Sequence, residues 1–220
     1  MGSILSRQLQ RVGHPAQNPI YYSSNSADVS GYVLRMKSDN VTHVLFCDLG
    51  LFVFATQAET QQYRPRYGVS TFNTPVLFLQ GVVPDAQLAG AMGSGFDPTL
   101  DVDAQHDPSK AEMPAIAQCE SIAKADGLTY NSQRRFAHGV LYDTCDILQL
   151  IATAAKHAGA LDGPAIVRGL GAAGATWRAA VTWRSGLSPA VHAMPAAARD
   201  IYFEGGCKCF QYRGGTLPFT

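Results

Sequence analysis

A nearly continuous apolar run, VTHVLFC at residues 41–47, lies between two segments with helical periodicity. Such a run is typical of a strand in a parallel sheet that helices cover on both faces. Residues 29–36 place apolar side chains at the spacing of one helical face, and residues 50–62 show a similar stripe. A further strand is predicted at 66–71. The order strand, helix, strand places this part of the chain in the α/β class.

The amino-acid composition of the chain changes after Pro75. Residues 75–111 are rich in Gly, Pro and Asp, and they contain one expected strand at 89–94. Gly205-Gly206 predicts a hairpin between the last two strands. The other predicted helices are at about 4–12, 113–125, 136–158 and from Pro164, and the other predicted strands at 18–22, 179–183, 198–204 and 207–213.

Charge and hydrophobicity exclude several classes of protein. The 220 residues carry 17 basic and 17 acidic side chains, whereas a sequence-independent nucleic-acid binder needs an excess of Lys and Arg. Apolar residues make up 46% of the chain, which predicts a folded core rather than disorder. No stretch approaches the ~18 uninterrupted apolar residues of a membrane span. The first fifteen residues show no secretory signal.

The stretch from Gly169 to Gly174 matches G-x-G-x-x-G, the turn that binds dinucleotides. That fingerprint also needs a preceding strand and an acidic residue ~20 positions later. Pro164 favours a helix before the glycines, and no acidic residue lies between Asp162 and Asp200. A Gly-rich helix end is the favoured interpretation. A nucleotide-dependent cytoplasmic α/β enzyme is kept as the alternative function.

Metal sites and catalytic groups are not predicted. Five polar residues match EF-hand positions, but His106 stands where the loop needs Gly, so a solvated acidic loop is expected; the five are Asp101, Asp103, Gln105, Asp107 and Glu112. The cysteines and histidines lack zinc spacing. His43, inside an apolar strand, is expected to be a core residue. Hydrolase signatures are missing, so we expect a protein that is not an enzyme and has no metal or cofactor.

The five cysteines leave at least one thiol free. Cys119 and Cys145 lie in consecutive predicted helices with a short connection, so antiparallel packing can bring their Cα atoms within the ~4.4–6.8 Å of a disulfide. We therefore predict this bridge, with reduced core thiols as the alternative. Cys207 and Cys209 are two apart in a predicted strand and would share a face, which makes a mutual bridge awkward. The pairing of Cys47, Cys207 and Cys209 stays open.

Several passages together resemble a known family, the type I periplasmic substrate-binding proteins of ABC transporters of the branched-chain amino acid class. The resemblance covers nearly all 220 residues, but only about the later three-fifths of a family member. The passages are QAETQQYRPRYGVSTF (57–72), AQLAGAMGSGFDPTLDV (86–102), MPAIAQCESIAKADG (113–127), YDTCDILQLIATAAKHAGALDGPAIVRGL (142–170) and RDIYFEGGCKCFQYRGG (199–215).

The resemblance implies a two-lobed α/β protein that closes on a small polar solute and delivers it to an ABC permease. Residues 1–73 would belong to the second lobe, 74–183 to part of the first, and 184–220 would return strands to the second. The opening half of the first lobe would be absent, so the chain is expected to be a truncated solute-binding protein. Family members are periplasmic or extracellular, and no cofactor or nucleic-acid partner is implied.

The same resemblance suggests where a solute would bind. In open α/β sheets ligands bind at the carboxyl ends of strands, which here are Asp48 to Leu51 and Ser70 to Phe72. Phe136 resembles an aromatic residue that lines the cleft. Amino-acid binders of the family often place a carboxylate near Thr71. This position is not acidic here, and Asp48 is the expected substitute. Ordinary strand-end capping is the alternative role of Ser70 and Thr71.

Overall fold

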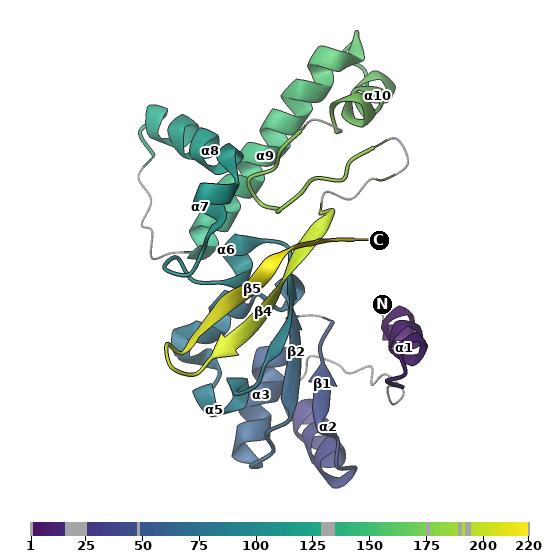
Figure 1. Ribbon diagram of the computed structural model, residues 1–220, viewed down its shortest axis with the longest axis vertical. Helices are drawn as coiled ribbons and strands as arrows, with labels where there is room; N and C mark the ends of the chain where they lie inside the picture. The colour runs from purple at the N-terminus through teal and green to yellow at the C-terminus, as the bar shows by residue number, and fades with distance from the viewer. Residues whose placement is uncertain are drawn as a thin grey trace.

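Figure 1 shows a computed structural model of the chain, which describes residues 2–15, 26–47, 49–128, 135–174, 177–188, 191 and 195–219. The predicted strand at 18–22 lies outside these residues. The strands are β1 (His43–Leu45), β2 (Arg66–Ser70), β3 (Met92–Gly95), β4 (Ala197–Glu204) and β5 (Cys209–Pro218). The longer helices are α1 (Gly2–Arg11), α2 (Ser26–Ser38), α3 (Leu51–Thr60), α8 (Pro114–Ala125), α9 (Arg135–Ala158) and α10 (Gly163–Ala173). Short turns of helix are η1 (Thr71–Asn73), α4 (Pro75–Leu77), η2 (Phe78–Val82), α5 (Asp85–Leu88), α6 (Pro98–Asp101) and α7 (Ser109–Glu112).

The described strands form one sheet in the order β1-β2-β3-β4-β5. β1, β2 and β3 run parallel, while β4 pairs antiparallel with both β3 and β5. The carboxyl ends of the three parallel strands therefore meet at one edge of the sheet. Helices α2 and α3 lie beside the β1–β2 part of the sheet, and α1 stands apart from it (Figure 1).

β1 is an edge strand rather than the fully covered strand that its apolar run predicts. Only Val44 of its three residues is buried, and His43 and Leu45 are exposed. The expectation that His43 is a core residue is therefore wrong. Its Nδ1 lies 2.9 Å from the hydroxyl of Thr42, at the surface. Among the described residues β1 pairs with β2 alone, and sequence periodicity does not reveal the place of a strand in its sheet.

The sheet takes strands from all three segments of the predicted division. β1 and β2 come from residues 1–73, β3 from 74–183, and β4 and β5 from 184–220. The predicted boundary at residues 73 and 74 is wrong, because β3 pairs with β2, with Gly68 beside Met92. The chain leaves the sheet after Gly95. The Gly-rich segment after Pro75 contains turns, and it returns the chain to the same sheet at β3.

Two separate clusters of buried side chains hold the molecule together. The first packs α2 and α3 against the sheet, and its largest members are Phe54, Tyr67, Phe78 and Phe210. The second joins α8, α9 and residues 177–181, and includes Ile116, Tyr142 and Trp177. Figure 1 shows these as a lower part with the sheet and an upper part made of helices. The division into two clusters is what a two-lobed chain requires.

A disulfide joins Cys119 of α8 to Cys145 of α9, the pair that the sequence analysis predicted, with the Cα atoms 5.8 Å apart. Both residues are buried in the second cluster, which packs α8 against the much longer α9. The side-chain amide of Gln149 lies 3.0 Å from the Cys145 sulfur. The bridge closes a loop of 26 residues in sequence, and such a cross-link stabilises by restricting the unfolded chain.

A second disulfide joins Cys207 to Cys209, whose Cα atoms are 5.2 Å apart. The expectation that both lie on one strand face is wrong, because β5 begins only at Cys209 and Cys207 belongs to the turn after β4. Lys208 between them has a φ of 54°, a left-handed conformation that changes the direction of the chain. Cys47 keeps a free, exposed thiol.

Residues 179–183 do not form the predicted strand. They run as an irregular segment that Asp146 of α9 holds in place through its carboxylate. The backbone N–H of Ala180 donates to both oxygens of Asp146, at 2.9 and 2.8 Å, and the N–H of Val181 donates at 3.1 Å. Buried backbone N–H groups need acceptors, and the Asp146 carboxylate supplies here the acceptors that a neighbouring strand would otherwise supply.

The glycines at 169–174 belong to α10 and its end, not to a nucleotide-binding turn. Asp162 caps this helix by accepting from the N–H of Ala165 at 2.8 Å, and Pro164 lies in its first turn. A Cβ atom at Gly169 would collide with the backbone carbonyl of Ala154 on α9. Gly169 therefore allows α9 and α10 to pack closely. The interpretation of residues 169–174 as a nucleotide-binding turn, which supported the nucleotide-dependent alternative, is wrong.

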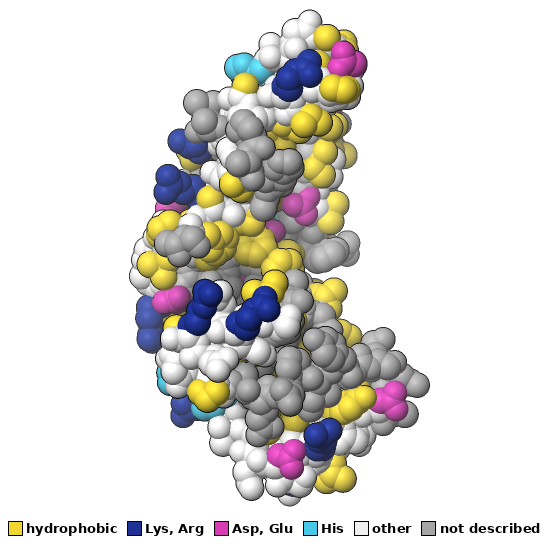
Figure 2. Space-filling view, turned by 90° about the vertical axis from the view of Figure 1, so that its right-hand side faces the viewer, with side chains coloured by type: hydrophobic (Ala, Val, Ile, Leu, Met, Phe, Trp, Pro, Cys, Tyr) yellow, Lys and Arg dark blue, Asp and Glu magenta, His cyan; other side chains and the backbone are white. Residues whose placement is uncertain are grey.

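α9 carries exposed apolar side chains along one side, at positions Val140, Ile147, Leu148 and Ile151. The sequence analysis assigned few strands to this part of the chain, and the described sheet lies in the other part. Figure 2 shows hydrophobic side chains exposed along the upper part of one face, the part that holds α8, α9 and α10. Among the described residues, no helix is long and apolar enough to cross a membrane.

The buried carboxyl of Asp146 should make stability depend on pH. Burial raises its pKa to about 6 from an ordinary 3.8, although the bonds from Ala180 and Val181 act in the opposite direction. Between these values the folded state holds a proton that the unfolded state has lost, so stability falls as pH rises. Relative to Asp146→Asn, the wild type should lose about 1–2 kcal/mol of unfolding free energy between pH 4 and 7. Urea denaturation across this range measures the difference, and a constant difference would contradict the assignment.

Candidate ligand-binding site

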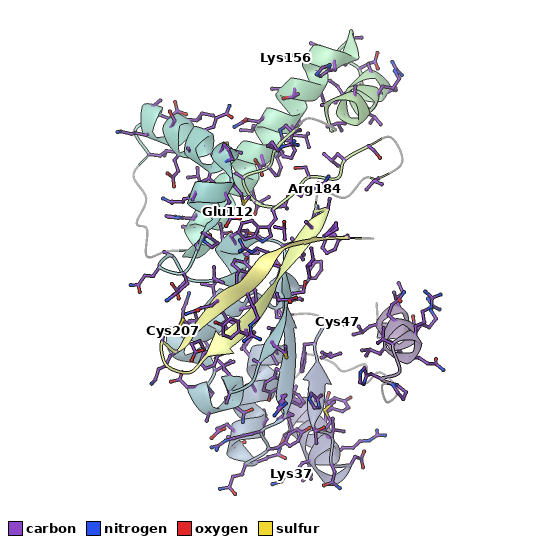
Figure 3. The ribbon with its side chains drawn as sticks, viewed as in Figure 1. Lys37, Cys47, Glu112, Lys156, Arg184 and Cys207 are labelled. Carbon is purple, nitrogen blue, oxygen red and sulfur yellow. A yellow bond between two sulfur atoms is a disulfide. The ribbon has the colours of Figure 1, made fainter. Side chains whose placement is uncertain are left out.

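A cavity of about 860 Å³ opens where the three parallel strands end. Each strand contributes residues that follow its last position, and α9 closes the other side. The lining residues are Cys47, Leu49 and Gly50 after β1, Thr71, Phe72 and Thr74 after β2, Phe96, Asp97 and Leu100 after β3, and Asp143 of α9. Figure 3 labels Cys47 near the upper end of β1. The carboxyl ends of parallel strands are the usual binding position in open α/β sheets.

Aromatic and aliphatic side chains form much of the cavity wall. The rings of Phe72 and Phe96 meet edge to face, with their centroids 5.5 Å apart. Phe72 is 55% exposed, so its ring stands at the open side of the cavity. Leu49 and Leu100 add aliphatic surface. Such a wall suits the apolar part of a small ligand, while a few polar groups fix its orientation.

Two carboxylates supply the charge of the described lining. Asp97 is buried and caps α6, accepting from the N–H of Thr99 at 2.9 Å and from its hydroxyl at 2.7 Å. Asp143 of α9 also lines the cavity. Loss of water around Asp143 raises the pKa of its carboxyl above the ordinary value. The described lining residues include these two carboxylates and no Lys, Arg or His side chain.

Buried hydrogen bonds next to the cavity link three segments of the chain. Thr71, directly after β2, donates its hydroxyl to Asp101 of α6 at 2.8 Å. Tyr212 of β5 donates to the other oxygen of Asp101 at 2.7 Å. The Thr71 hydroxyl in turn accepts from the backbone N–H of Phe96 at 2.8 Å. These bonds fix the ends of β2 and β3 relative to each other and to α6.

Asp101 is fully buried, and this burial raises its pKa well above the ordinary value. The hydroxyls of Tyr212 and Thr71 lower the pKa, and the nearby charge of Asp97 raises it further. Gly95 makes the arrangement sterically feasible, since a Cβ atom there would overlap the Asp101 carboxylate. Asp101 is therefore not part of the solvated acidic loop that the sequence analysis expected.

The predicted site residues have different positions. Thr71 lines the cavity, but its hydroxyl is engaged by Asp101 and Phe96. Ser70 caps the end of β2, where its N–H donates to the side-chain oxygen of Asn73 at 2.8 Å. This is the capping role named as its alternative. Asp48 and the side chain of Phe136 lie outside the described residues.

Sequence reasoning missed Asp97 and Asp143, although the first carried a readable signal. Asp followed by Pro at 97–98 is a typical helix start, an N-cap before Pro at the first position. It directly follows β3, so it marks the carboxyl edge of the sheet. Asp143 has no such signal, because its place in the cavity depends on how α9 packs.

The solved structures that this chain resembles include two binding proteins. One is a periplasmic binding protein type 1 from Bordetella pertussis Tohama I, with a TM-score of 0.66, 14% identity, and coverage of 99% of this chain and 57% of that one. The other is an ABC transporter substrate-binding protein of Aeropyrum pernix, with a TM-score of 0.61, 12% identity, and coverage of 89% and 50%. No family model and no curated protein matches the chain.

The sheet, the two clusters and these matches define the fold class of the chain, which is α/β. The chain has the type I periplasmic-binding fold, with one nearly complete lobe and part of the other. It spans 57% and 50% of the two chains that it matches. The resemblance found in the sequence and the structural match lead to the same fold.

Removal of the Thr71 hydroxyl should destabilise the fold through the buried group. In Thr71→Val the N–H of Phe96 loses its acceptor and one oxygen of Asp101 loses its donor, which should cost about 1–3 kcal/mol. Thr144→Val is the matched control, because the exposed Thr144 hydroxyl bonds only within α9, to the Val140 carbonyl. That variant should stay within about 0.5 kcal/mol of wild type. Equal unfolding free energies for the two variants, measured in urea, would argue against the role of Thr71.

Proposed function

We propose that the chain is part of a solute-binding protein that captures an amino acid or a similar small polar solute for uptake by an ABC permease. The observation that carries this proposal is the cavity at the carboxyl ends of β1, β2 and β3, with carboxylates at Asp97 and Asp143 beside the Phe72–Phe96 wall. The fold match to two solute-binding proteins supports the same function. Such a protein binds and releases its ligand unchanged.

The charge of the cavity supports a ligand with an ammonium or similar cationic group. Asp143 comes from α9 and lines the same cavity as the residues that follow the strand ends, so a cation bound in the cavity would contact it. Asp97 already accepts two bonds from Thr99, and its charge adds to the field without requiring direct contact. The aromatic pair would cover the apolar part of the same ligand.

Asp48 and Phe136 remain proposed ligand contacts, with Thr71 as part of the wall. The neighbours of Asp48 in the sequence, Cys47 and Leu49, both line the cavity, which supports its inclusion. Phe136 stands about two turns before Asp143 on α9. Ser70 is not proposed as a contact, because its N–H and hydroxyl both face Asn73.

The periplasm or the extracellular space is the proposed location of the full protein. Two disulfides within 220 residues support an oxidising compartment, since cytosolic proteins rarely keep such bridges. A nucleotide-dependent cytoplasmic enzyme is not favoured. The glycines that suggested it lie in α10, and the two bridges argue against the cytosol.

The proposal is tested by calorimetric titration of the chain with amino acids of different charge. Amino acids with a cationic side chain should bind more tightly than acidic ones. Asp143→Asn should weaken the best ligand by at least tenfold, since loss of a charge partner in a binding site costs about 2–5 kcal/mol. Asp48→Ala should have a similar effect. Asp126→Asn is the control, because Asp126 ends α8 at the surface.

Two outcomes would contradict the proposal. An affinity that Asp143→Asn and Asp48→Ala leave unchanged would move the ligand away from the cavity. Preference for acidic over cationic solutes would contradict the inferred charge of the ligand. Folding of each variant is checked by circular dichroism, so that a lost site is distinguished from a lost structure.

A further inference from the structure

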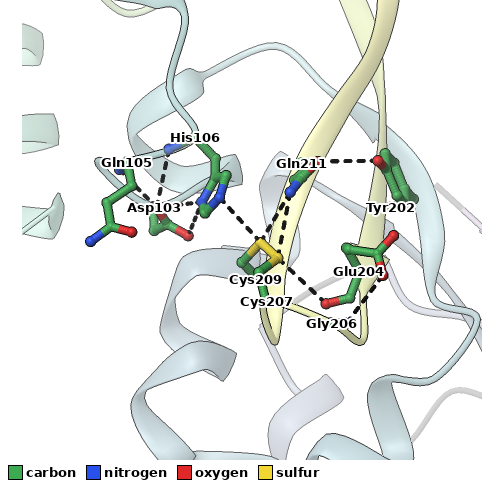
Figure 4. The surroundings of a disulfide bond; sticks show 9 residues. All are labelled: Asp103, Gln105, His106, Tyr202, Glu204, Gly206, Cys207, Cys209 and Gln211. Atoms are coloured by element: carbon green, nitrogen blue, oxygen red, sulfur yellow. Dashed lines mark hydrogen bonds and ion pairs between the residues drawn. A yellow bond between two sulfur atoms is a disulfide. The ribbon is translucent and has the colours of Figure 1, made fainter.

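Three potential metal ligands converge at the turn between β4 and β5, away from the cavity. Cys207 lies in the turn, Cys209 begins β5, and His106 comes from the loop after α6. Their ligand atoms all lie within 4.8 Å of one another. The Nε2 atom of His106 is 3.7 Å from the sulfur of Cys209 (Figure 4). About one hundred residues separate the histidine from the cysteines, so spacing in the sequence could not show this cluster.

A carboxylate fixes the orientation of the histidine. Both oxygens of Asp103 lie 2.9 Å from Nδ1 of His106. The same carboxylate accepts from the backbone N–H groups of Gln105 and His106, at 2.8 and 3.2 Å, so it is itself held in place. With its proton on Nδ1 toward Asp103, the ring presents the Nε2 lone pair to the sulfur. In metal sites, a carboxylate that does not itself bind the metal often holds a metal-ligating histidine in this way.

The sulfurs also have a fixed polar environment. The side-chain amide of Gln211 lies 3.4 Å from each of the two sulfur atoms. Its oxygen accepts from the hydroxyl of Tyr202 at 3.1 Å, so the NH₂ group is directed at the sulfurs (Figure 4). An N–H donor near sulfur stabilises the thiolate, which is the form that binds metal. Cys209 is buried while Cys207 is exposed, so the cluster has one side open to solvent.

We propose that this turn, when its disulfide is reduced, binds one thiophilic divalent cation of the zinc class. The ligands are the sulfurs of Cys207 and Cys209 and Nε2 of His106, and a water molecule completes the tetrahedron on the open side. Two thiolates and one imidazole are a set that Zn²⁺ prefers, at bond lengths of about 2.3 and 2.0–2.1 Å. Small side-chain movements bring the three atoms to a common centre.

The chemistry needs a reductant, and we name a dithiol or a phosphine. A dithiol transfers two electrons and two protons to the Cys207–Cys209 bridge; the sulfur–sulfur bond breaks, two thiols form, and the dithiol becomes a disulfide. A phosphine supplies the two electrons, water supplies the two protons and the oxygen, and the phosphine becomes a phosphine oxide. Zinc then displaces one proton from each thiol and bonds to both thiolates and to the neutral imidazole. The oxidised turn has no thiolate to offer. The site therefore exists only in the reduced protein.

Zinc binding to the full chain tests the proposal. The chain is reduced with a phosphine, freed of reductant without air, and titrated with Zn²⁺ against a chromogenic chelator. The reduced wild type should bind one equivalent that the oxidised wild type does not bind. Cys207→Ser and His106→Gln should each weaken this binding by at least tenfold, and Asp103→Asn by about 10–100-fold. Co²⁺ in place of Zn²⁺ should give a thiolate-to-metal absorption band in the reduced wild type only.

Three controls separate this cluster from the other cysteines and histidines. Cys47→Ser, His157→Gln and the double variant Cys119→Ser/Cys145→Ser should keep the reduced-state equivalent of zinc. Loss of the equivalent in any of these would place the metal elsewhere and overturn the proposal. Unchanged affinity in both Cys207→Ser and His106→Gln, with folding verified by circular dichroism, would overturn it as well. Cys207 is exposed, so its replacement does not depend on repacking of the core.

Discussion

The bonds from Thr71 and Tyr212 to the buried carboxyl of Asp101 hold the three separate parts of this chain together. They tie the end of β2 and strand β5 to the short helix that follows β3. A fully buried carboxyl is costly unless its oxygens are bonded, and here each oxygen receives a hydroxyl. The cavity depends on this constraint, because its lining residues follow the strand ends that these bonds fix.

A second link joins the sheet to the helical part. The guanidinium of Arg199 in β4 stacks over the rings of Trp183 and Tyr212, at 4.7 and 5.2 Å from their centroids, and pairs with Glu112 of α7 at 3.0 Å. Tyr212 thus takes part in both links. Arg199 therefore couples the sheet to α7 and, through Trp183, to the second cluster of buried side chains.

The sequence predicted where helices and strands lie better than it predicted which segments they pack against. Apolar periodicity located α3, α8, α9 and the hairpin of β4 and β5, because these elements follow local rules. It failed where a distant residue decides the outcome. Residues 179–183 are apolar enough for a strand, but Asp146 supplies their acceptors; His43 lies in an apolar run, but its strand is at the edge. The cavity lies at the strand ends where the sequence predicts a site, whereas the place of Asp143 in its wall depends on how α9 packs.

We propose that the cavity at the parallel strand ends captures a small solute. Cys47 lines that cavity and has the free thiol, while the other four cysteines are bridged, so the oxidised chain can be labelled there without mutation. An environment-sensitive fluorophore on Cys47 should show a saturable change on titration with a cationic amino acid, reversed by dilution. A label that is unaffected by a solute whose binding calorimetry detects would place that solute elsewhere and contradict the account.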